Sequence, residues 1–222
     1  MDIKNKNKHL TNDELLVDYI KDQLEEKMQA SAMDINVTCR DGVAQLSGFV
    51  DVLAEKKYAE KIAKDMDGIK KIENSITIGV DSNITDKHME KEVRERLFTS
   101  EFKGNVNAVG VKVNNGVANL VGHVDKLKDS HIAMDLASRC RGIKDVVNNI
   151  KVDTANVFDD VTINNNIHGK IENKDIGCDV KNGVATLIGY VDNKAEAEFA
   201  KEIAMDVEGV TKVKNMIKIR KK

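Results

Sequence analysis

Apolar and polar residues alternate along three separate stretches of the chain. The apolar positions are Ile35, Val37 and Cys39, then Val109, Val111 and Val113, then Ile176, Cys178 and Val180. A period of two predicts β-strands with one buried face. Each stretch leads into Asp-Gly or Asn-Gly, the strongest short hairpin signal. The pattern therefore predicts three β-hairpins, whose second strands bury alternate residues from Ala44, Ala118 and Ala185 onward.

A helical period follows each hairpin. The apolar stripe at i, i+3, i+4 and i+7 is Ala59, Ile62, Ala63 and Met66, then Ala133, Leu136, Ala137 and Cys140, then Ala200, Ile203, Ala204 and Val207. Such spacing is typical of an amphipathic helix. We expect Asp51, Asp125 and Asp192 to cap these helices, because a carboxylate accepts hydrogen bonds from free N–H groups. A third strand follows, with apolar pairs at Ile76 and Ile78, Ile150 and Val152, and Ile217 and Ile219.

A further helix precedes each hairpin. Ile84-Thr85 with Met89, and Phe158-Asp159 with Ile163, fit a capped helix start with a hydrophobic staple. Leu10-Thr11 with Leu15 fits the same pattern, although the deeper apolar positions there fit better shifted by one. Each unit is therefore predicted as helix–strand–strand–helix–strand.

Three copies of one unit account for this regularity. The motif Gly-Val-Ala-x-Leu-x-Gly-x-Val-Asp begins at Gly42, Gly116 and Gly183. The shared framework positions are Gly42, Gly48, Gly68, Asn74, Gly116, Gly122, Gly142, Asn148, Gly183, Gly189, Gly209 and Asn215. We expect a polar tail at residues 1–10, then repeat 1 at 11–80, repeat 2 at 84–153 and repeat 3 at 158–220. Repeat 3 is about seven residues shorter between its first helix and first strand.

The fold class that follows is α+β, with two helices on one face of a three-stranded sheet in each αββαβ repeat. The sheet is mixed if the two parallel strands joined by the second helix are neighbours; otherwise the first strand lies between them. We interpret the framework glycines as structural, with Gly68, Gly142 and Gly209 ending the second helices in the left-handed conformation. Gly48, Gly122 and Gly189 would let helix and sheet approach closely, opposite small alanines.

The framework asparagines, Asn74, Asn148 and Asn215, fall on the inward face of the last strand. One interpretation is that they satisfy backbone groups at a turn or bulge. The other is a polar ligand site in each repeat.

This motif, with the later Gly-Val/Ile-x-x-Val/Ile-x-Asn-x-Ile run, resembles the BON domain family, named for bacterial osmotic-stress-induced and nodulation proteins. The resemblance covers residues 11 to 220 in three copies. It implies an αββαβ module without catalytic activity, with a role in binding phospholipid or membrane surfaces. Other family members are tied to osmotic stress, envelope integrity or potassium sensing.

The outward face of each sheet is the best candidate for function, because two helices can cover only one face. The candidate contact residues are Phe49, His123, Tyr190, Val184, Ile188 and Met216. A partly apolar open face normally has something covering it. Packing between repeats or between protomers is one explanation, and a lipid or protein partner is the other. Phe49, His123 and Tyr190 occupy equivalent positions, and amphipathic rings suit interfaces.

Charge adds a second candidate. The formal net charge of −2 argues against a nucleic-acid partner. Basic residues nevertheless gather at the C-terminus, and we consider Lys218, Arg220, Lys221 and Lys222 as membrane-docking charges. Solvated tails are the alternative explanation.

The chain offers no pattern for catalysis, a metal or a cofactor. The three cysteines take the place of apolar core residues in other copies, and the five histidines lack ligand spacing. No apolar run reaches the ~20 residues of a membrane-spanning helix, and the polar start is not a secretory signal, so we expect a cytoplasmic protein.

Three hypotheses follow. The first is a non-enzymatic module that binds an anionic phospholipid surface or another protein in a stress response. The second is a scaffold that forms homo-oligomers through its open sheets. The third is a sensor of a small ligand or potassium that uses one repeat.

Overall fold

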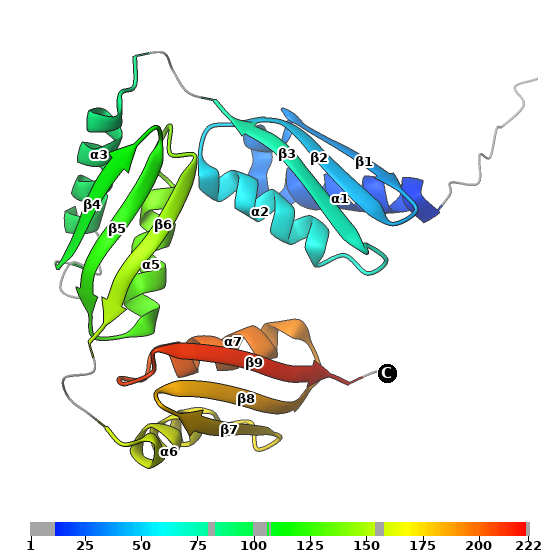
Figure 1. Cartoon of the computed structure of the whole chain (residues 1–222). Coiled ribbons are helices and arrows are strands. Elements are labelled where there is room, and N and C mark those ends of the chain that lie inside the picture. Colours follow the sequence, from blue (N-terminus) through cyan, green and yellow to red (C-terminus); the bar gives the residue numbers. More distant parts are fainter. Residues whose placement is uncertain (1–11, 80–82, 100–105, 107, 154–157, 221–222) are drawn as a thin grey trace, which may run out of the picture. The chain divides into compact units, whose positions relative to one another are not determined.

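The computed structural model describes residues 12–79, 83–99, 106, 108–153 and 158–220. Repeat 1 contains α1 (Asn12–Met28), the 3-10 helix η1 (Gln29–Ala32), β1 (Ile35–Arg40), β2 (Val43–Val50), α2 (Leu53–Lys64) and β3 (Lys71–Ile78). Repeat 2 contains α3 (Asp86–Thr99), β4 (Val109–Asn114), β5 (Val117–Val124), α5 (Leu127–Ser138) and β6 (Asp145–Val152). Repeat 3 contains α6 (Asp160–Lys170), β7 (Ile176–Lys181), β8 (Val184–Val191), α7 (Lys194–Met205) and β9 (Lys212–Ile219) (Figure 1). The expected tail at residues 1–10 lies outside the described residues.

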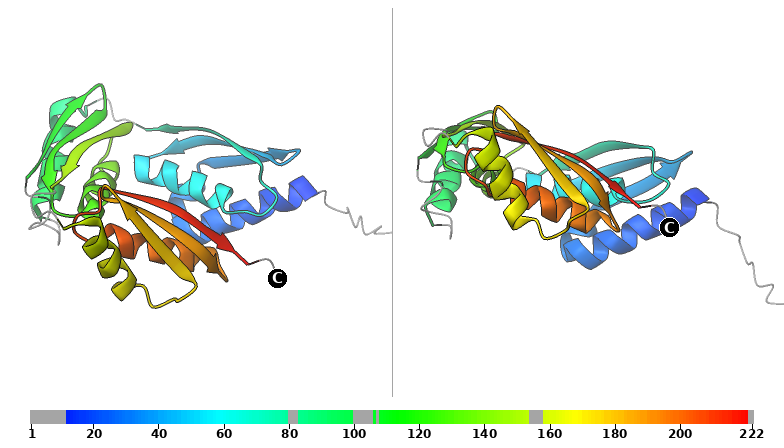
Figure 2. Two further views of the ribbon diagram at one scale, coloured as in Figure 1. Left: turned by 60° about the horizontal axis from the view of Figure 1, so that its bottom comes forward. Right: turned by 90° about the horizontal axis from the view of Figure 1, so that it is seen from below.

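Each repeat builds one three-stranded mixed sheet. The strand orders are β1-β2-β3, β4-β5-β6 and β7-β8-β9. In repeats 1 and 3 the hairpin strands pair antiparallel, and the last strand pairs parallel with the second. Of the two strand orders that the sequence allowed, the one with adjacent parallel strands is therefore present. Both helices of a repeat lie on the same face of its sheet, which confirms the predicted α+β class (Figures 1 and 2).

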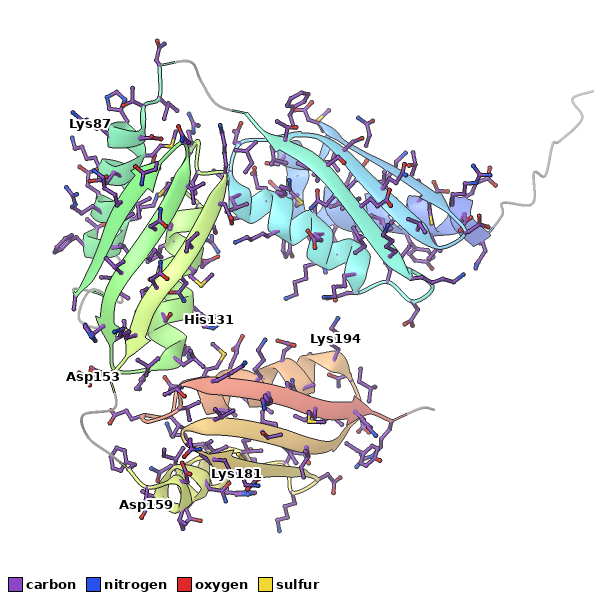
Figure 3. All side chains as sticks on the ribbon, in the orientation of Figure 1. Lys87, His131, Asp153, Asp159, Lys181 and Lys194 are labelled. Carbon is purple, nitrogen blue, oxygen red and sulfur yellow. The ribbon has the colours of Figure 1, made fainter. Side chains whose placement is uncertain are left out.

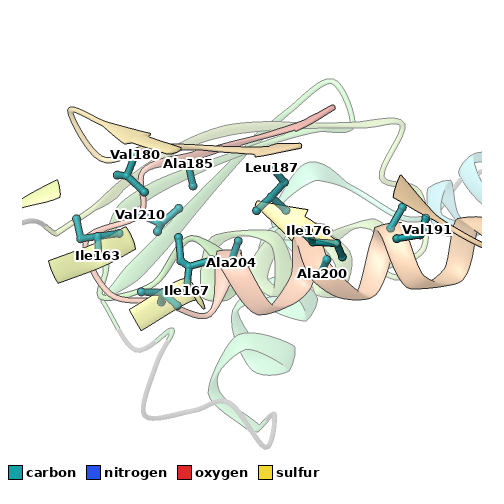
Figure 4. Close-up of a cluster of buried hydrophobic side chains, with 12 residues drawn as sticks. Ile163, Ile167, Ile176, Val180, Ala185, Leu187, Val191, Ala200, Ala204 and Val210 are labelled. Carbon is teal, nitrogen blue, oxygen red and sulfur yellow. The ribbon is translucent and has the colours of Figure 1, made fainter. Parts of the chain in front are cut away.

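The core of each repeat lies between its sheet and its two helices. In repeat 3, the α6 residues Ile163 and Ile167 meet the sheet residue Leu187 and the α7 residues Ala200 and Ala204 (Figure 4). All five are almost completely buried. Burying a large aliphatic side chain stabilises the fold by about 1.5–3 kcal/mol, so the predicted stripes supply the main force that holds helices to sheet.

Gly48, Gly122 and Gly189 are required for a reason other than the predicted helix approach. Their φ angles lie between +123° and +134°, a range that residues with a side chain rarely adopt. A Cβ atom at any of the three would lie 1.9–2.0 Å from the carbonyl oxygen of the residue just before the first strand. The close neighbour is therefore the backbone at the start of the adjacent strand. In repeats 1 and 3 the N–H groups of Phe49 and Tyr190 donate to these same carbonyl oxygens.

The framework asparagines tie the last strand to the second helix. Asn215 donates its amide N–H to the Ala197 carbonyl at 3.0 Å and accepts from the Ile217 N–H at 3.1 Å. Asn74 makes the same pair of contacts with Lys56 and Ile76. Asn148 differs, because its N–H reaches the Ser130 hydroxyl at 2.7 Å. These bonds use both ends of each amide, which supports the structural interpretation of the three asparagines.

The helix starts agree with the sequence in part. Asp159, labelled in Figure 3, accepts from the Thr162 N–H at 2.6 Å and caps α6 as predicted. The prediction that Asp51 and Asp192 cap the second helices is wrong. Asn193 caps α7, and in repeat 1 the Glu55 carboxylate accepts from the N–H groups of Asp51 and Val52.

None of the three cysteines forms a disulfide. Cys140 is buried, whereas Cys39 and Cys178 are partly exposed. Burial, followed by the nearby Asp179 carboxylate, raises the pKa of Cys178 to about 11. Burial and the Asp13 carboxylate also raise the pKa of Cys39. Because the reactive form of a thiol is the thiolate, these pKa values make Cys39 and Cys178 poor nucleophiles at neutral pH.

Candidate functional site

The uncovered sheet face of repeat 3 gathers most of the predicted contact residues. We call it the open face of repeat 3 and define it by Val184, Thr186, Ile188 and Tyr190 of β8 and Lys212, Lys214, Met216 and Lys218 of β9. Residues in register across the two strands pair Ile188 with Met216 and Tyr190 with Lys218. Neighbouring strands lie about 4.7–4.9 Å apart, so side chains at these paired positions form one surface.

Three large side chains of this face are open to solvent: Ile188 is 50%, Tyr190 53% and Met216 60% exposed. The prediction that they point away from the helices is confirmed by this exposure. Val184 is partly buried at the other end of β8. Contiguous exposed apolar side chains rimmed by polar ones are characteristic of interaction surfaces.

Lysines flank this apolar group along the edge strand. Lys212, Lys214 and Lys218 alternate with inward residues, so they share the outward face of β9 with Met216. At about 3.3 Å per residue, the three span roughly 20 Å of the strand. None of the three forms an ion pair with any residue that the structure describes. Lys218 was predicted from the sequence as a docking charge. Lys212 and Lys214 were not predicted, although their alternation with Val213 and Asn215 is a recognisable strand pattern.

Arg220 differs from these lysines. Its guanidinium forms ion pairs with Asp192 and with Asp175, which raise the pKa of Arg220. The two carboxylates offset its charge, so Arg220 ties the end of β9 to the neighbouring loops. Lys221 and Lys222, the other two predicted docking charges, lie outside the described residues.

The open faces of the other two repeats carry less charge and less apolar surface. In repeat 1 Phe49 is 63% exposed, but its neighbours are polar, and Lys71 pairs with Glu73 at 2.7 Å. That lysine, and then Gln45, lower the pKa of Glu73. In repeat 2 His123 is exposed beside Val121 and Val147. Phe49, His123 and Tyr190 therefore belong to three separate sheets, and only Tyr190 lies beside a row of lysines.

A carboxylate of the first helix accepts hydrogen bonds from the hairpin turn, and we call this contact the clasp. It was not predicted from the sequence. Asp13 accepts from the N–H groups of Asp41 at 2.7 Å and Gly42 at 3.2 Å. Asp160 makes the same contacts with Asn182 and Gly183 at 2.8 and 3.0 Å. A shared acidic position at the start of each first helix was the available signal. These bonds fix the turn that joins the two hairpin strands.

The Asp13 clasp gives the hairpin of repeat 1 a pH dependence. The Asp41 N–H, the largest cause, lowers the pKa of Asp13 below its ordinary 3.8. Because the folded-state pKa is lowered, the ionised Asp13 carboxylate stabilises the fold above about pH 3.8. This contribution is lost as the pH falls through the lowered pKa. We expect the protection factors of the Asp41 and Gly42 amides, taken against the intrinsic exchange rate at each pH, to fall below that pH in the wild type. An Asp13→Asn variant should lose this dependence; an unchanged profile would contradict the clasp.

The described residues contain no group of three or more His, Cys, Asp or Glu side chains placed to hold a metal ion. Among the described helices, none is both long enough and apolar enough to cross a bilayer.

Repeated αββαβ units, each with one sheet face that carries none of the described helices, define a tandem α+β repeat protein with open sheet surfaces. The model of the BON domain family matches residues 12–80, 85–154 and 159–221. These three matches cover most of the chain, which therefore belongs to the BON domain family, as the sequence motif predicted.

Two relatives carry the same family relationship. Osmotically-inducible protein Y of Escherichia coli is 26% identical over 153 residues, covering 66% of this chain and 76% of the relative. Outer membrane lipoprotein DolP of Haemophilus influenzae is 28% identical over 142 residues, covering 61% of this chain and 72% of the relative. The expected cytoplasmic location finds no support in these relatives, since one is named for the outer membrane.

Solved structures add little. The type III secretion protein CdsD of Chlamydia trachomatis covers 92% of both chains at 16% identity, with a TM-score of 0.26. The periplasmic domain of PrgH covers 84% of this chain and 95% of its own at 13% identity, with a TM-score of 0.23. At these scores no structural or functional argument follows.

Proposed function

We propose that this chain is a non-enzymatic binding module that docks on anionic phospholipid surfaces through the open face of repeat 3. The observation that carries the proposal is the combination, on one sheet face, of exposed Ile188, Tyr190 and Met216 with unpaired lysines. Apolar and amphipathic side chains partition into the headgroup region, and cations are attracted to anionic lipids. Both properties distinguish repeat 3 from repeats 1 and 2, whose open faces carry less charge and less apolar surface.

The expected affinity is weak and reversible. Each lysine near an anionic surface contributes about 1 kcal/mol. Burying the exposed part of Ile188, Tyr190 and Met216 adds roughly 1 kcal/mol for each side chain. The total of about 6 kcal/mol corresponds to a dissociation constant between millimolar and micromolar. Such binding suits a module that associates reversibly with a membrane surface.

The relatives support a role of this kind. One is named for osmotic induction and the other for the outer membrane. We extend these associations to this chain as part of the proposal: it acts at a membrane surface during stress.

A fluorescent label on the face tests where docking occurs. We would replace Met216 by Cys in a chain whose native cysteines are changed to valine, and attach an environment-sensitive dye. Anionic vesicles should shift the emission to the blue as the dye enters the apolar layer. Ser75 is the matched control, because it occupies the equivalent exposed position on β3 of repeat 1. An equal response at both positions, or a response at position 75 alone, would argue against docking through repeat 3.

A further inference from the structure

The first helix of repeat 3 is shorter than that of repeat 1. The residues that clasp the hairpin turn, Asp13 and Asp41, lie 28 positions apart, whereas Asp160 and Asn182 lie 22 apart. The difference of six residues is also the difference between the 17-residue α1 and the 11-residue α6. At 1.5 Å per residue, α6 is therefore about 9 Å shorter than α1.

A groove lies where the missing helical turns would run. It encloses about 370 Å³ between the end of α6, the loop into β7, and α7. Ile171, Ile176, Phe199 and Ile203 form its apolar lining. Phe199 is 65% exposed, and Ile203 is more exposed than its buried equivalent in repeat 1, Ile62. The groove is therefore an apolar surface on the helix side, separate from the open sheet face.

Repeat 1 shows what fills this place in a sister repeat. There Leu24 is the equivalent of Ile171, and the extra residues follow it, so that the end of α1 and η1 add the half-buried Met28 and the buried Ala32. The following η1 places Ser31 so that its hydroxyl donates to Glu55 of α2 at 2.7 Å. Glu196 is the equivalent of Glu55 and lines the groove of repeat 3. The natural occupant of this position is thus a short helical segment that follows the equivalent of Ile171 and carries an apolar residue such as Met28.

The rim of the groove is acidic. Glu172 and Glu196 both line it, and neither forms an ion pair within the described part of the chain. The one lysine of the rim, Lys170, is already paired with Asp206 at 3.6 Å. A partner with basic residues would therefore be favoured over an acidic one.

We propose that the groove of repeat 3 binds a short amphipathic helix of a partner protein, with an apolar residue in the position of Met28 and lysine or arginine beside it. This is the helix-in-groove mode of recognition. The groove is on the helix side of the repeat, so the interaction does not depend on lipid binding by the sheet face.

A pair of peptides from this chain tests the proposal. Residues 18–32 contain the segment that fills the site in repeat 1, with four carboxylates and two lysines. A second peptide carries Glu25→Lys and Glu26→Lys. We expect the basic peptide to bind the full chain saturably in fluorescence anisotropy, at least tenfold tighter than the native one. Absence of saturable binding by the basic peptide would overturn the proposal.

Substitutions locate the binding. Phe199→Ala should weaken binding of the basic peptide at least tenfold, and Glu172→Lys with Glu196→Lys should reverse the preference between the peptides. Phe199 and Glu172 are exposed, and the half-buried Glu196 carboxylate accepts from the side chain of its neighbour Asn193, which still caps α7 through the Glu196 N–H, so the fold should persist. Tyr190→Ala is the matched control: it removes an exposed ring on the sheet face and should leave peptide binding unchanged while it weakens vesicle binding. Equal effects of Phe199→Ala and Tyr190→Ala on the peptide would contradict a groove site.

Discussion

Gly189→Ala is expected to unfold most of repeat 3. The φ angle of Gly189 is +134°, and a Cβ atom there would lie 2.0 Å from the carbonyl oxygen of Asp175. The clash involves backbone on both sides, so a side-chain rotation cannot relieve it. A strained backbone conformation costs about 1–3 kcal/mol, and displacing β7 from β8 adds a comparable loss of pairing, for a total of about 4 kcal/mol. Small domains hold little more than this in reserve.

Hydrogen exchange followed by mass spectrometry measures this loss repeat by repeat. Peptides from β7, β8 and β9 should lose protection in Gly189→Ala, while peptides from repeat 1 keep theirs. Gly169→Ala is the matched control, because a Cβ atom there meets no atom within 4 Å. Near the end of α6 it should leave stability unchanged or raise it by up to about 1 kcal/mol. Full protection of β7 and β8 in Gly189→Ala would contradict this account of the strand pair.

Reversing the charge of Lys212, Lys214 and Lys218 is expected to abolish docking on anionic vesicles. Each lysine contributes about 1 kcal/mol, so removal of all three weakens binding about 100-fold, and glutamates add repulsion. All three side chains are exposed and unpaired, so the sheet should persist. Vesicle titration measures the change in affinity.

The control variant has the same change in net charge, made at three lysines elsewhere on the chain. Lys57, Lys61 and Lys64 are exposed on α2 of repeat 1, on the helix side of that repeat. Their reversal to glutamate should weaken binding much less than reversal on β9. Equal losses in the two triple variants would mean that total charge, and not the open face of repeat 3, governs binding.

Much of the fold could be predicted because its signals are local. Alternation at Val180, Ala185 and Leu187 indicates strands, and Asn-Gly indicates the turn between them. Parity then assigns Ile188, Tyr190 and Met216 to the outward face. The helix caps were less predictable, because Asp192 and Asn193 are both good capping residues and a shift of one position decides between them.

Contacts between distant residues could not be predicted in this way. The Asp13 clasp joins residues 28 positions apart, and the Arg220 ion pair with Asp175 joins residues 45 apart. Sequence alone made Arg220 a free terminal cation, whereas the structure pairs it with two carboxylates. The shorter stretch before the first strand of repeat 3 was visible as a length difference, but the structure places the shortening in α6 and not in the connection after it. That it leaves a groove beside Phe199 depends on how α6 and α7 pack.

Flotation of the full chain with vesicles tests most directly whether this chain binds anionic membrane surfaces. At near-physiological salt the chain should float with vesicles rich in anionic phospholipid, remain at the bottom with zwitterionic vesicles, and be released as salt is raised, because screening weakens the attraction to the lysines. A chain that stays at the bottom with both kinds of vesicle, at lipid concentrations above the expected dissociation constant, would contradict the claim.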